Sequence, residues 1–289
     1  MDIRAKVREW LLEDIGSAPF QIETAGDPVC EAEIRAKSSG ILAGVPFIGV
    51  MFEECARLIA LDIPVPVEIS WEKSDGDEAS PGDLLAVVRG HAQILLKCER
   101  TALNLLSYIS EIATNTSRRL AEAGEFPETF KGLLDTRKGA PGLMYFEKYG
   151  VRTGGGKNHR LGMFDGDMIK DNDIKVAGSI TAAIDAVWGR RYMVDAQIEV
   201  QSLGELGEVM GDGRVHMILL DNMDIDTLGT AVAQARERGV ALHTGKRYEL
   251  EASGIKGGNL GDIARTGVDY ISTSALVRSA PALDFNMKI

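Results

Sequence analysis

Cysteine is scarce in this chain of 289 residues, which contains only Cys30, Cys55 and Cys98. Their number is odd, and no two of them stand in a CxxC pair. These features argue against a disulfide framework and against a zinc site built on cysteines. Sparse, unpaired cysteines are typical of proteins kept in a reducing compartment. We therefore expect a cytoplasmic protein.

Histidine and long apolar segments are also scarce. The four histidines are scattered along the chain and give no support for a zinc triad. The longest apolar run covers the 13 residues from Gly40 to Phe52, whereas a membrane span needs roughly 20. The N-terminus mixes both charge signs with an apolar face, so it resembles neither a signal peptide nor a transit peptide. The sequence thus predicts no association with a membrane.

Positive charge is in deficit overall, yet it is concentrated in one segment. The net charge is −11, and such a surface repels nucleic acid and anionic membranes. Residues 131–170, here called the basic island, carry eight Lys or Arg against four Asp or Glu. The island is therefore +4 and the rest of the chain −15. Because its charges stand between glycines and apolar pairs, not at helical spacing, they favour a pocket for a small, highly charged anion over a solvated helix face.

Common nucleotide and hydrolase motifs are missing. The run TGGGKNHR (153–160) fails as a Walker loop, because Val151 replaces the first glycine and Asn158 follows the lysine. No GxGxxG follows a strand, and no GxSxG occurs. The three glycines would let backbone N–H groups approach an anion, although a plain tight turn explains them equally well. His159 lies in this polar, glycine-flanked loop, where a core histidine is not expected.

The first part of the chain predicts an α+β domain. Residues 3–12 have an amphipathic helical pattern, and residues 31–37 and 65–71 alternate as half-buried strands do. A turn cluster at 74–83 separates the second of these strands from a further strand at 84–90, so the two predict a hairpin. Residues 91–123 predict one long helix or two.

The second part repeats a strand–helix unit. Short apolar strands end in charged or hydroxyl residues and alternate with helical stretches; those strand-end residues are Asp135, Lys170, Glu199, Asp221, Glu251, Ser253 and Ser274. Glycines at 189, 211, 239 and 267 stand where helix C-caps are expected. Repeated units of this kind give parallel strands with the ligand at their carboxyl ends. Polar residues at nearly every strand end favour a barrel over an open sheet, and six or seven strands make it incomplete.

The expected organisation is therefore an N-terminal α/β domain over residues 1–110 and an α/β barrel over 111–281. Residues 282–289 alternate as a strand does and are expected to return to the N-terminal sheet. Glu199 and Asp221 end neighbouring strands of the barrel. They could hold Mg²⁺ through a phosphate-bearing substrate, bind sugar hydroxyls, or pair with the basic island.

Several motifs, in order and spacing across nearly the whole chain, resemble one family. They are CERTALNLLSYISEIAT, DTRKGAPGLMYFEKYGVRTGGGKNHRLG, MIKDN, IEV, LLDNM and LEASG. Together they are similar to quinolinate phosphoribosyltransferase, also called nicotinate-nucleotide pyrophosphorylase (carboxylating). The resemblance implies an N-terminal α/β sandwich domain plus an incomplete (β/α) barrel with parallel strands, assembled as a homodimer or higher homo-oligomer with shared active sites.

The resemblance also implies a reaction and a set of site residues. Quinolinate would react with phosphoribosyl pyrophosphate to give nicotinate mononucleotide, pyrophosphate and CO₂, with Mg²⁺ as cofactor. Two polyanions must then be held together, which requires fixed cations. By similarity, Arg137, His159 and Arg160 would bind the quinolinate carboxylates and Lys138 and Lys170 would bridge the substrates. Glu199 and Asp221 would hold ribose and Mg²⁺; Ser253, Gly254 and Ser274 would cradle the 5′-phosphate; Arg100 would enter the neighbouring subunit's pocket.

The sequence departs from the family pattern at three places. Gly139-Ala140 replaces a Thr-Thr pair, Asp173 replaces a histidine, and Ile255-Lys256 replaces a glycine pair. Two alternatives therefore stand beside the first reading. One is a paralogue that accepts another aromatic acid, or one associated with molybdate transport. The other is an anion-binding protein on the same barrel without turnover.

Overall fold

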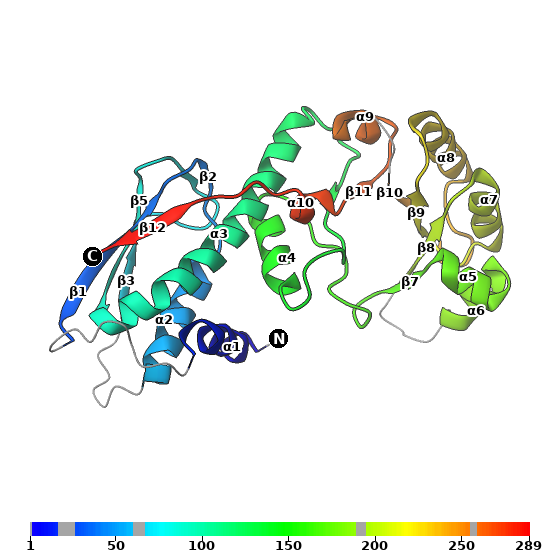
Figure 1. Cartoon of the computed structure of the whole chain (residues 1–289). Coiled ribbons are helices and arrows are strands. Elements are labelled where there is room, and N and C mark those ends of the chain that lie inside the picture. The colour runs from blue at the N-terminus through cyan, green and yellow to red at the C-terminus, as the bar shows by residue number, and fades with distance from the viewer. Residues whose placement is uncertain (1, 17–26, 60–66, 189–194, 255–258) are drawn as a thin grey trace. The chain divides into compact units, whose positions relative to one another are not determined.

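The computed structural model describes residues 2–16, 27–59, 67–188, 195–254 and 259–289. The chain divides into two compact units, each made of segments distant in sequence (Figure 1). Unit 1 comprises Met1–Ser117, Tyr145–Gly155 and Ser279–Ile289, and unit 2 comprises Arg118–Met144 and Gly156–Arg278. Residue 110, where the sequence suggests the domain boundary, lies inside a helix.

Unit 1 is built on an antiparallel sheet in the order β12-β1-β5-β3. Its strands are β1 (Val29–Ala36), β3 (Glu68–Trp71), β5 (Leu84–His91) and β12 (Phe285–Lys288). A two-stranded pair, β2 (Gly40–Ile41) with β4 (Glu78–Ala79), accompanies it. The predicted hairpin is confirmed by the pairing of β3 with β5, and the C-terminal strand β12 pairs with β1. Residues 65 and 66 of the second predicted strand lie outside the described residues.

Among the described residues, four helices belong wholly or largely to unit 1. They are α1 (Ile3–Ile15), α2 (Val45–Ile59), α3 (Ala92–Glu122) and α4 (Met144–Thr153). The predicted N-terminal helix is confirmed, and residues 92–122 form one helix in which most apolar positions are buried. Helix α4 was not expected, and it packs closely on α3. A Cβ at Gly154 would lie 2.2 Å from the Ala113 carbonyl oxygen, so the glycine run begins with a helix-packing contact within unit 1.

Within the described part of the chain, unit 2 is built on six parallel strands in the order β6-β11-β10-β9-β8-β7. The strands are β6 (Gly132–Leu134), β7 (Asp167–Ile169), β8 (Ala196–Val200), β9 (Met217–Asp221), β10 (Glu249–Ser253) and β11 (Tyr270–Ser272). Strands β6 and β7 are the edges, and among the described residues they do not pair with each other. Lys157 adds a parallel bridge to Leu134 beside β6. The predicted incomplete parallel barrel is confirmed.

Helices connect the parallel strands and cover them. They are α5 (Asp171–Ala177), α6 (Ile180–Val187), α7 (Leu203–Asp212), α8 (Ile225–Arg238), α9 (Leu260–Arg265) and α10 (Ala275–Arg278). Their ends follow ordinary caps: Ser179, Ser202 and Asp224 each accept an N–H of the first turn. Gly239 is a C-cap as expected. The expectation for Gly211 is wrong, because α7 continues to Asp212 and Gly213 caps it in the left-handed region. Gly189 lies outside the described residues.

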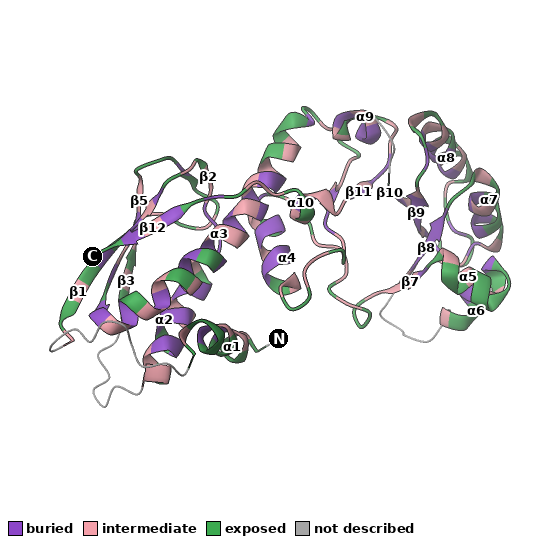
Figure 2. Ribbon diagram, in the orientation of Figure 1, coloured by how far each residue is buried: buried purple, intermediate pink, exposed green. Residues whose placement is uncertain are grey.

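Alternation along the strands sends apolar side chains to one face and polar ones to the other. Ile198, Ile218 and Leu250 are fully buried, as are Leu220 and Ala252. Figure 2 shows buried residues along β8 and β9. The residues next to them in sequence, such as Glu199, Asp221 and Ser253, therefore share the opposite face. No helix in the described ranges combines the length and apolar character needed to cross a membrane.

Candidate active site

A cavity of about 260 Å³ lies at the carboxyl ends of the parallel strands of unit 2. Its lining residues come from the ends of β7 to β11 and from the loops after β6 and before β7. They are Thr136, Arg137, Lys138, His159, Arg160, Met168, Lys170, Glu199, Leu219, Asp221, Glu251, Ser253 and Ser272. This is the end at which parallel α/β barrels bind their ligands.

Four of the eight basic residues of the island line this cavity: Arg137, Lys138, Arg160 and Lys170. Burial lowers the pKa of Arg160, and the neighbouring positive charge of Arg137 lowers it further. Like charges gathered in this way repel each other, so an anion placed among them relieves the repulsion. The geometry therefore provides a cationic surface for an anionic ligand.

The remaining basic residues of the island lie elsewhere. Lys131 pairs with Glu249 at the amino end of β10, and Lys157 lies 5.9 Å from the Tyr270 ring centroid. Lys148 and Arg152 belong to helix α4 of unit 1. The basic island is thus a feature of sequence, and only part of it forms the cavity.

Two carboxylates face these cations from adjacent strands, Glu199 on β8 and Asp221 on β9. The Lys170 Nζ lies 2.7 Å from Glu199 Oε2. Burial raises the pKa of Asp221, and the negative charge of Glu199 raises it further. Asn222 Nδ2 donates to Asp221 Oδ2 at 2.6 Å. Of the possibilities open from sequence, pairing with the island is observed for Glu199.

The loop after Lys157 is held by a buried carboxylate. Asp135, which is 1 % exposed, accepts from Asn158 Nδ2 at 2.7 Å and from the His159 N–H at 2.9 Å. Main-chain bonds join Lys157 to Leu133 and Asp135. The loop is therefore fixed to the end of β6, and it delivers His159 and Arg160 to the cavity.

Lys170 stands directly after β7 and also begins helix α5. The Asp173 carboxylate accepts the Lys170 N–H at 2.8 Å in a capping box. An acidic residue in the first turn of a helix is favoured by the helix dipole. Asp173, one of the departures from the family pattern, thus helps to fix the backbone of Lys170.

The three residues expected near a phosphate differ in their positions. Ser253 lines the cavity at the end of β10. Gly254 follows it at φ +65°, and a Cβ there would lie 2.9 Å from Asp221 Oδ1, so only glycine fits. Ser274 does not line the cavity; it lies before α10, where its carbonyl accepts from Val277 and Arg278. Ser272 on β11 lines the cavity instead. Ile255-Lys256 lie outside the described residues.

Arg100 lies on α3 in unit 1. Its side chain is 64 % exposed, and its Nη2 lies 3.9 Å from Glu99 Oε1. A contact of this length on an exposed surface contributes little to stability. The structure therefore leaves the Arg100 guanidinium available on the surface of its helix.

Sequence reasoning missed Glu251 and Ser272 as residues that line this cavity. Glu251 was noted at the end of its strand but not assigned to the site. The signal was present in the alternation: Glu249, Glu251 and Ser253 share one face of β10, opposite the buried Leu250 and Ala252. A two-residue period traced along each strand would have found them.

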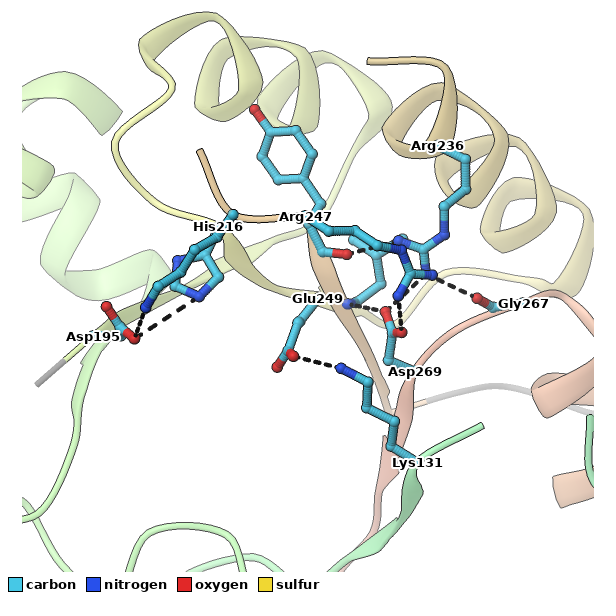
Figure 3. Close-up of polar contacts among 11 residues, drawn as sticks. Lys131, Asp195, His216, Arg236, Arg247, Glu249, Gly267 and Asp269 are labelled. Atoms are coloured by element: carbon cyan, nitrogen blue, oxygen red, sulfur yellow. Dashed lines mark hydrogen bonds and ion pairs between the residues drawn. The ribbon is translucent and has the colours of Figure 1, made fainter. Parts of the chain in front are cut away.

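A larger cavity, of about 420 Å³, lies nearer the amino ends of the same strands and shares His159, Arg160, Met168 and Glu251 with the first. Charged groups at this end are mutually paired, as Figure 3 shows. Asp269 is fully buried and binds Arg236 at 2.8 Å and Arg247 at 3.0 Å. Such pairing stabilises the barrel. In α/β barrels the amino end of the strands generally contributes to stability and the carboxyl end holds the active site.

An incomplete parallel barrel whose carboxyl end presents four cations facing two carboxylates defines the class of protein: a barrel with a site for polyanionic ligands. Comparisons with known proteins identify the family. The model of the quinolinate phosphoribosyl transferase N-terminal domain matches residues 18–110, and that of the C-terminal domain matches residues 112–288. The chain belongs to the quinolinate phosphoribosyltransferase family.

Individual relatives agree with this assignment over most of their length. A Synechocystis sp. protein named "Probable nicotinate-nucleotide pyrophosphorylase (carboxylating)" is 37% identical over 286 residues, which cover 98% of this chain and 91% of that protein. A tobacco protein named quinolinate phosphoribosyltransferase (decarboxylating) 1b is 35% identical, covering 96% and 78%. The crystal structure of NadC from Streptococcus pyogenes matches with a TM-score of 0.83 at 32% identity, covering 99% and 95%.

Proposed function

We propose that this protein is a decarboxylating quinolinate phosphoribosyltransferase of NAD biosynthesis, acting on quinolinate and phosphoribosyl pyrophosphate. The observation that carries the proposal is the cavity itself: Arg137, Lys138, Arg160 and Lys170 line it in a chain whose relatives bear this name. Quinolinate has two carboxylates, and its partner has a phosphate and a pyrophosphate. Fixed cations offset the repulsion between such substrates.

The proposed reaction begins when the pyridine nitrogen of quinolinate bonds to the ribose C1 as the bond from C1 to pyrophosphate breaks. The bond between C2 and its carboxylate then breaks, CO₂ leaves, and the electron pair left on C2 takes a proton. Arg137 and Arg160 bind carboxylates, for which the planar guanidinium is suited. Lys138 and Lys170 lie between the two substrates, where they hold the departing pyrophosphate. Ser253 and Gly254 receive the 5′-phosphate.

Mg²⁺ is proposed as the cofactor, bound largely through the substrate. Among the described residues no cluster of three or more His, Cys, Asp or Glu could hold a metal by itself. Glu199 and Asp221 nevertheless fit a cation. Burial and, after it, the negative charge of Glu199 raise the pKa of Asp221, and Mg²⁺ commonly takes one or two carboxylates with phosphate oxygens and water. When bound, the ion would neutralise charge on the pyrophosphate leaving group.

We further propose a homodimer or higher oligomer, located in the cytoplasm, in which Arg100 enters the neighbouring subunit's site. The exposure of Arg100 on α3 supports its availability for a partner. No nucleic acid or membrane partner is proposed, since the net charge is −11.

The deciding experiment mixes the protein with quinolinate, phosphoribosyl pyrophosphate and Mg²⁺ and measures nicotinate mononucleotide. Formation of nicotinate mononucleotide with one equivalent of CO₂ supports the proposal. Pyrophosphate release only with another aromatic acid would indicate a paralogous transferase, and ligand binding without pyrophosphate release would indicate an anion-binding protein.

A further inference from the structure

One loop beside the cavity has no part in the reaction described above. Residues 161–166 connect Arg160 to the start of β7. The apolar side chains of this loop are exposed: Leu161 lies at the surface, and Met163 and Phe164 are 72 % and 73 % exposed. Burial of apolar surface therefore stabilises the loop little, and its shape depends on hydrogen bonds.

Asp165 accepts two of those hydrogen bonds. Its Oδ2 accepts the Leu161 N–H at 2.6 Å, and its Oδ1 accepts the Gly162 N–H at 2.9 Å. Both oxygens of the carboxylate are thus used at once, and the end of the loop is folded back on its beginning. Hydrogen bonds to an ionised carboxylate are roughly twice as strong as bonds between neutral groups, so this single side chain closes the loop.

Arg160 lies at one end of the closed loop and is bound to the other end. Its Nη1 donates to the Gly166 carbonyl oxygen at 2.8 Å. A Cβ at Gly166 would lie 3.5 Å from the Arg160 Cβ and 3.6 Å from its Cδ, so the arginine side chain runs beside the Gly166 backbone. Because Gly166 directly follows Asp165 in the chain, the bonds of Asp165 fix the carbonyl group that holds the guanidinium.

This tether matters because Arg160 lines both cavities, whereas Asp165 and Asp167 line only the larger one. Burial lowers the pKa of Arg160, and the positive charge of Arg137 lowers it further. The negative charges of Asp165 and Asp167 act in the opposite direction. Electrostatic attraction alone would therefore draw the guanidinium toward the larger cavity, away from the carboxyl ends of the strands. The bond to Gly166 limits that movement.

We propose that Asp165 is a positioning residue for the acceptor: by closing the loop at Leu161 and Gly162, it holds the Arg160 guanidinium on Gly166, in the place where it binds an acceptor carboxylate. The inference rests on the proposed function, because it assigns a quinolinate carboxylate to Arg160. It makes Asp165, which does not line the cavity at the carboxyl ends of the strands, a determinant of acceptor affinity.

A purely electrostatic role for Asp165 predicts the opposite result. Removal of a negative charge near Arg160 would leave the cationic site more positive, so an anionic acceptor would bind more tightly. Loss of the bonds that close the loop would instead misplace Arg160 and weaken acceptor binding. The direction of the change in acceptor affinity therefore separates the two roles.

The first measurement needs no substrate. Backbone amide exchange in overlapping peptides that span residues 158–168 is followed by mass spectrometry in the wild type and in Asp165→Ala. We expect the Leu161 and Gly162 amides to be protected in the wild type and to exchange about tenfold or more faster in the variant. Unprotected amides in the wild type, or equal rates in the two proteins, would overturn the proposal.

The second measurement is kinetic. In Asp165→Ala the KM for quinolinate should rise about tenfold or more, while the KM for phosphoribosyl pyrophosphate stays within about twofold. Asp165→Asn keeps one oxygen as an acceptor, so its KM for quinolinate should lie between those of the wild type and Asp165→Ala. An unchanged or lower KM for quinolinate, or equal rises for both substrates, would overturn the positioning role.

Asp77→Asn is the matched control. Asp77 is exposed, and its Oδ2 accepts the Ser74 N–H at 2.7 Å in a loop of unit 1, so both KM values should be unchanged. A rise in the quinolinate KM equal to that of Asp165→Asn would contradict a specific role for Asp165. If the wild type forms no nicotinate mononucleotide, the proposed function fails, whereas the exchange measurement still decides whether Asp165 closes the loop.

Discussion

The charged residues at the amino end of the barrel can be tested for whether they contribute to stability or to catalysis. Asp269 is fully buried and accepts from Arg236, from Arg247 and from the Leu250 N–H at 2.9 Å. Asp269→Asn keeps the volume but replaces one oxygen with an NH₂ group, so at least one of three donors loses its acceptor. We expect this variant to lose stability and to keep its activity.

The expected loss in the free energy of unfolding depends on how exposed the two arginine partners of Asp269 are. Removing one member of a fully buried ion pair costs about 3–5 kcal/mol. Arg236 and Arg247 are 26 % and 47 % exposed, so water replaces part of what they lose, and we expect about 3 kcal/mol. For a chain of this size that corresponds to a fall in the melting temperature of roughly 6–12 °C.

Calorimetric melting and steady-state kinetics at 25 °C are the assays. Because Asp269 does not line the cavity at the carboxyl ends of the strands, kcat and both KM values should stay within about twofold. Asp195→Asn is the control: its pair with Lys246 is about half exposed, and its loss should cost under about 1 kcal/mol. An unchanged melting temperature for Asp269→Asn, or a tenfold loss of activity without loss of stability, would refute the reasoning.

Other expectations concern the cavity, the partner subunit and pH. Lys138→Ala should lower turnover about 10²–10³-fold with little change in melting temperature; lost stability with retained activity would contradict this. Asp221→Asn should weaken phosphoribosyl pyrophosphate more than quinolinate in calorimetric titrations with Mg²⁺, and equal losses would count against the assignment. Arg100→Ala and Lys138→Ala should each be inactive alone, yet mixed dimers should regain up to about half the activity; no recovery would place Arg100 in its own subunit's site. Hydrogen bonds from Arg214 lower the pKa of Asp212, so its stabilisation is present above its ordinary pKa near 4 and lost as the pH falls through the lower folded value. Unfolding curves of the wild type and Asp212→Asn should therefore differ at pH 7 and converge in acid; a constant gap would refute this.

Much of unit 2 could be predicted from sequence because alternation and strand-end polarity are local signals. They located β8, β9 and β10 and placed Glu199 and Asp221 on neighbouring strands. The end of β11 could not be read in this way. The pattern YISTS suggests a strand to Ser274, but β11 ends at Ser272. The Ser274 carbonyl instead accepts the N–H groups of Val277 and Arg278 at the start of α10, so Ser272, and not Ser274, lines the cavity.

Helix α4 could not be predicted because its residues pack against α3, which is distant in the sequence. The charge of Lys148 and Arg152 suggested part of a binding surface, whereas Lys148 is 3 % exposed within the helix. Gly154 belongs to the glycine run that appeared suited to an anion. The absence of side chains at Gly150 and Gly154 instead permits close approach to the backbone of α3. The sequence of residues 144–155 alone does not indicate this contact.

Three residues at two-residue intervals on β10 make different contacts: Glu249 pairs with Lys131, Glu251 Oε2 lies 3.3 Å from His159 Nε2, and Ser253 lines the cavity. Each residue can be exchanged without disturbing the other two. A deletion or insertion of one residue within the strand would instead turn the affected side chains to the helix-covered face and bring Leu250 or Ala252 inward. Evolution can therefore substitute residues of this strand but cannot change its length. Relatives that prefer another acceptor should differ from this chain in β10 by substitution, and in length only in the loops.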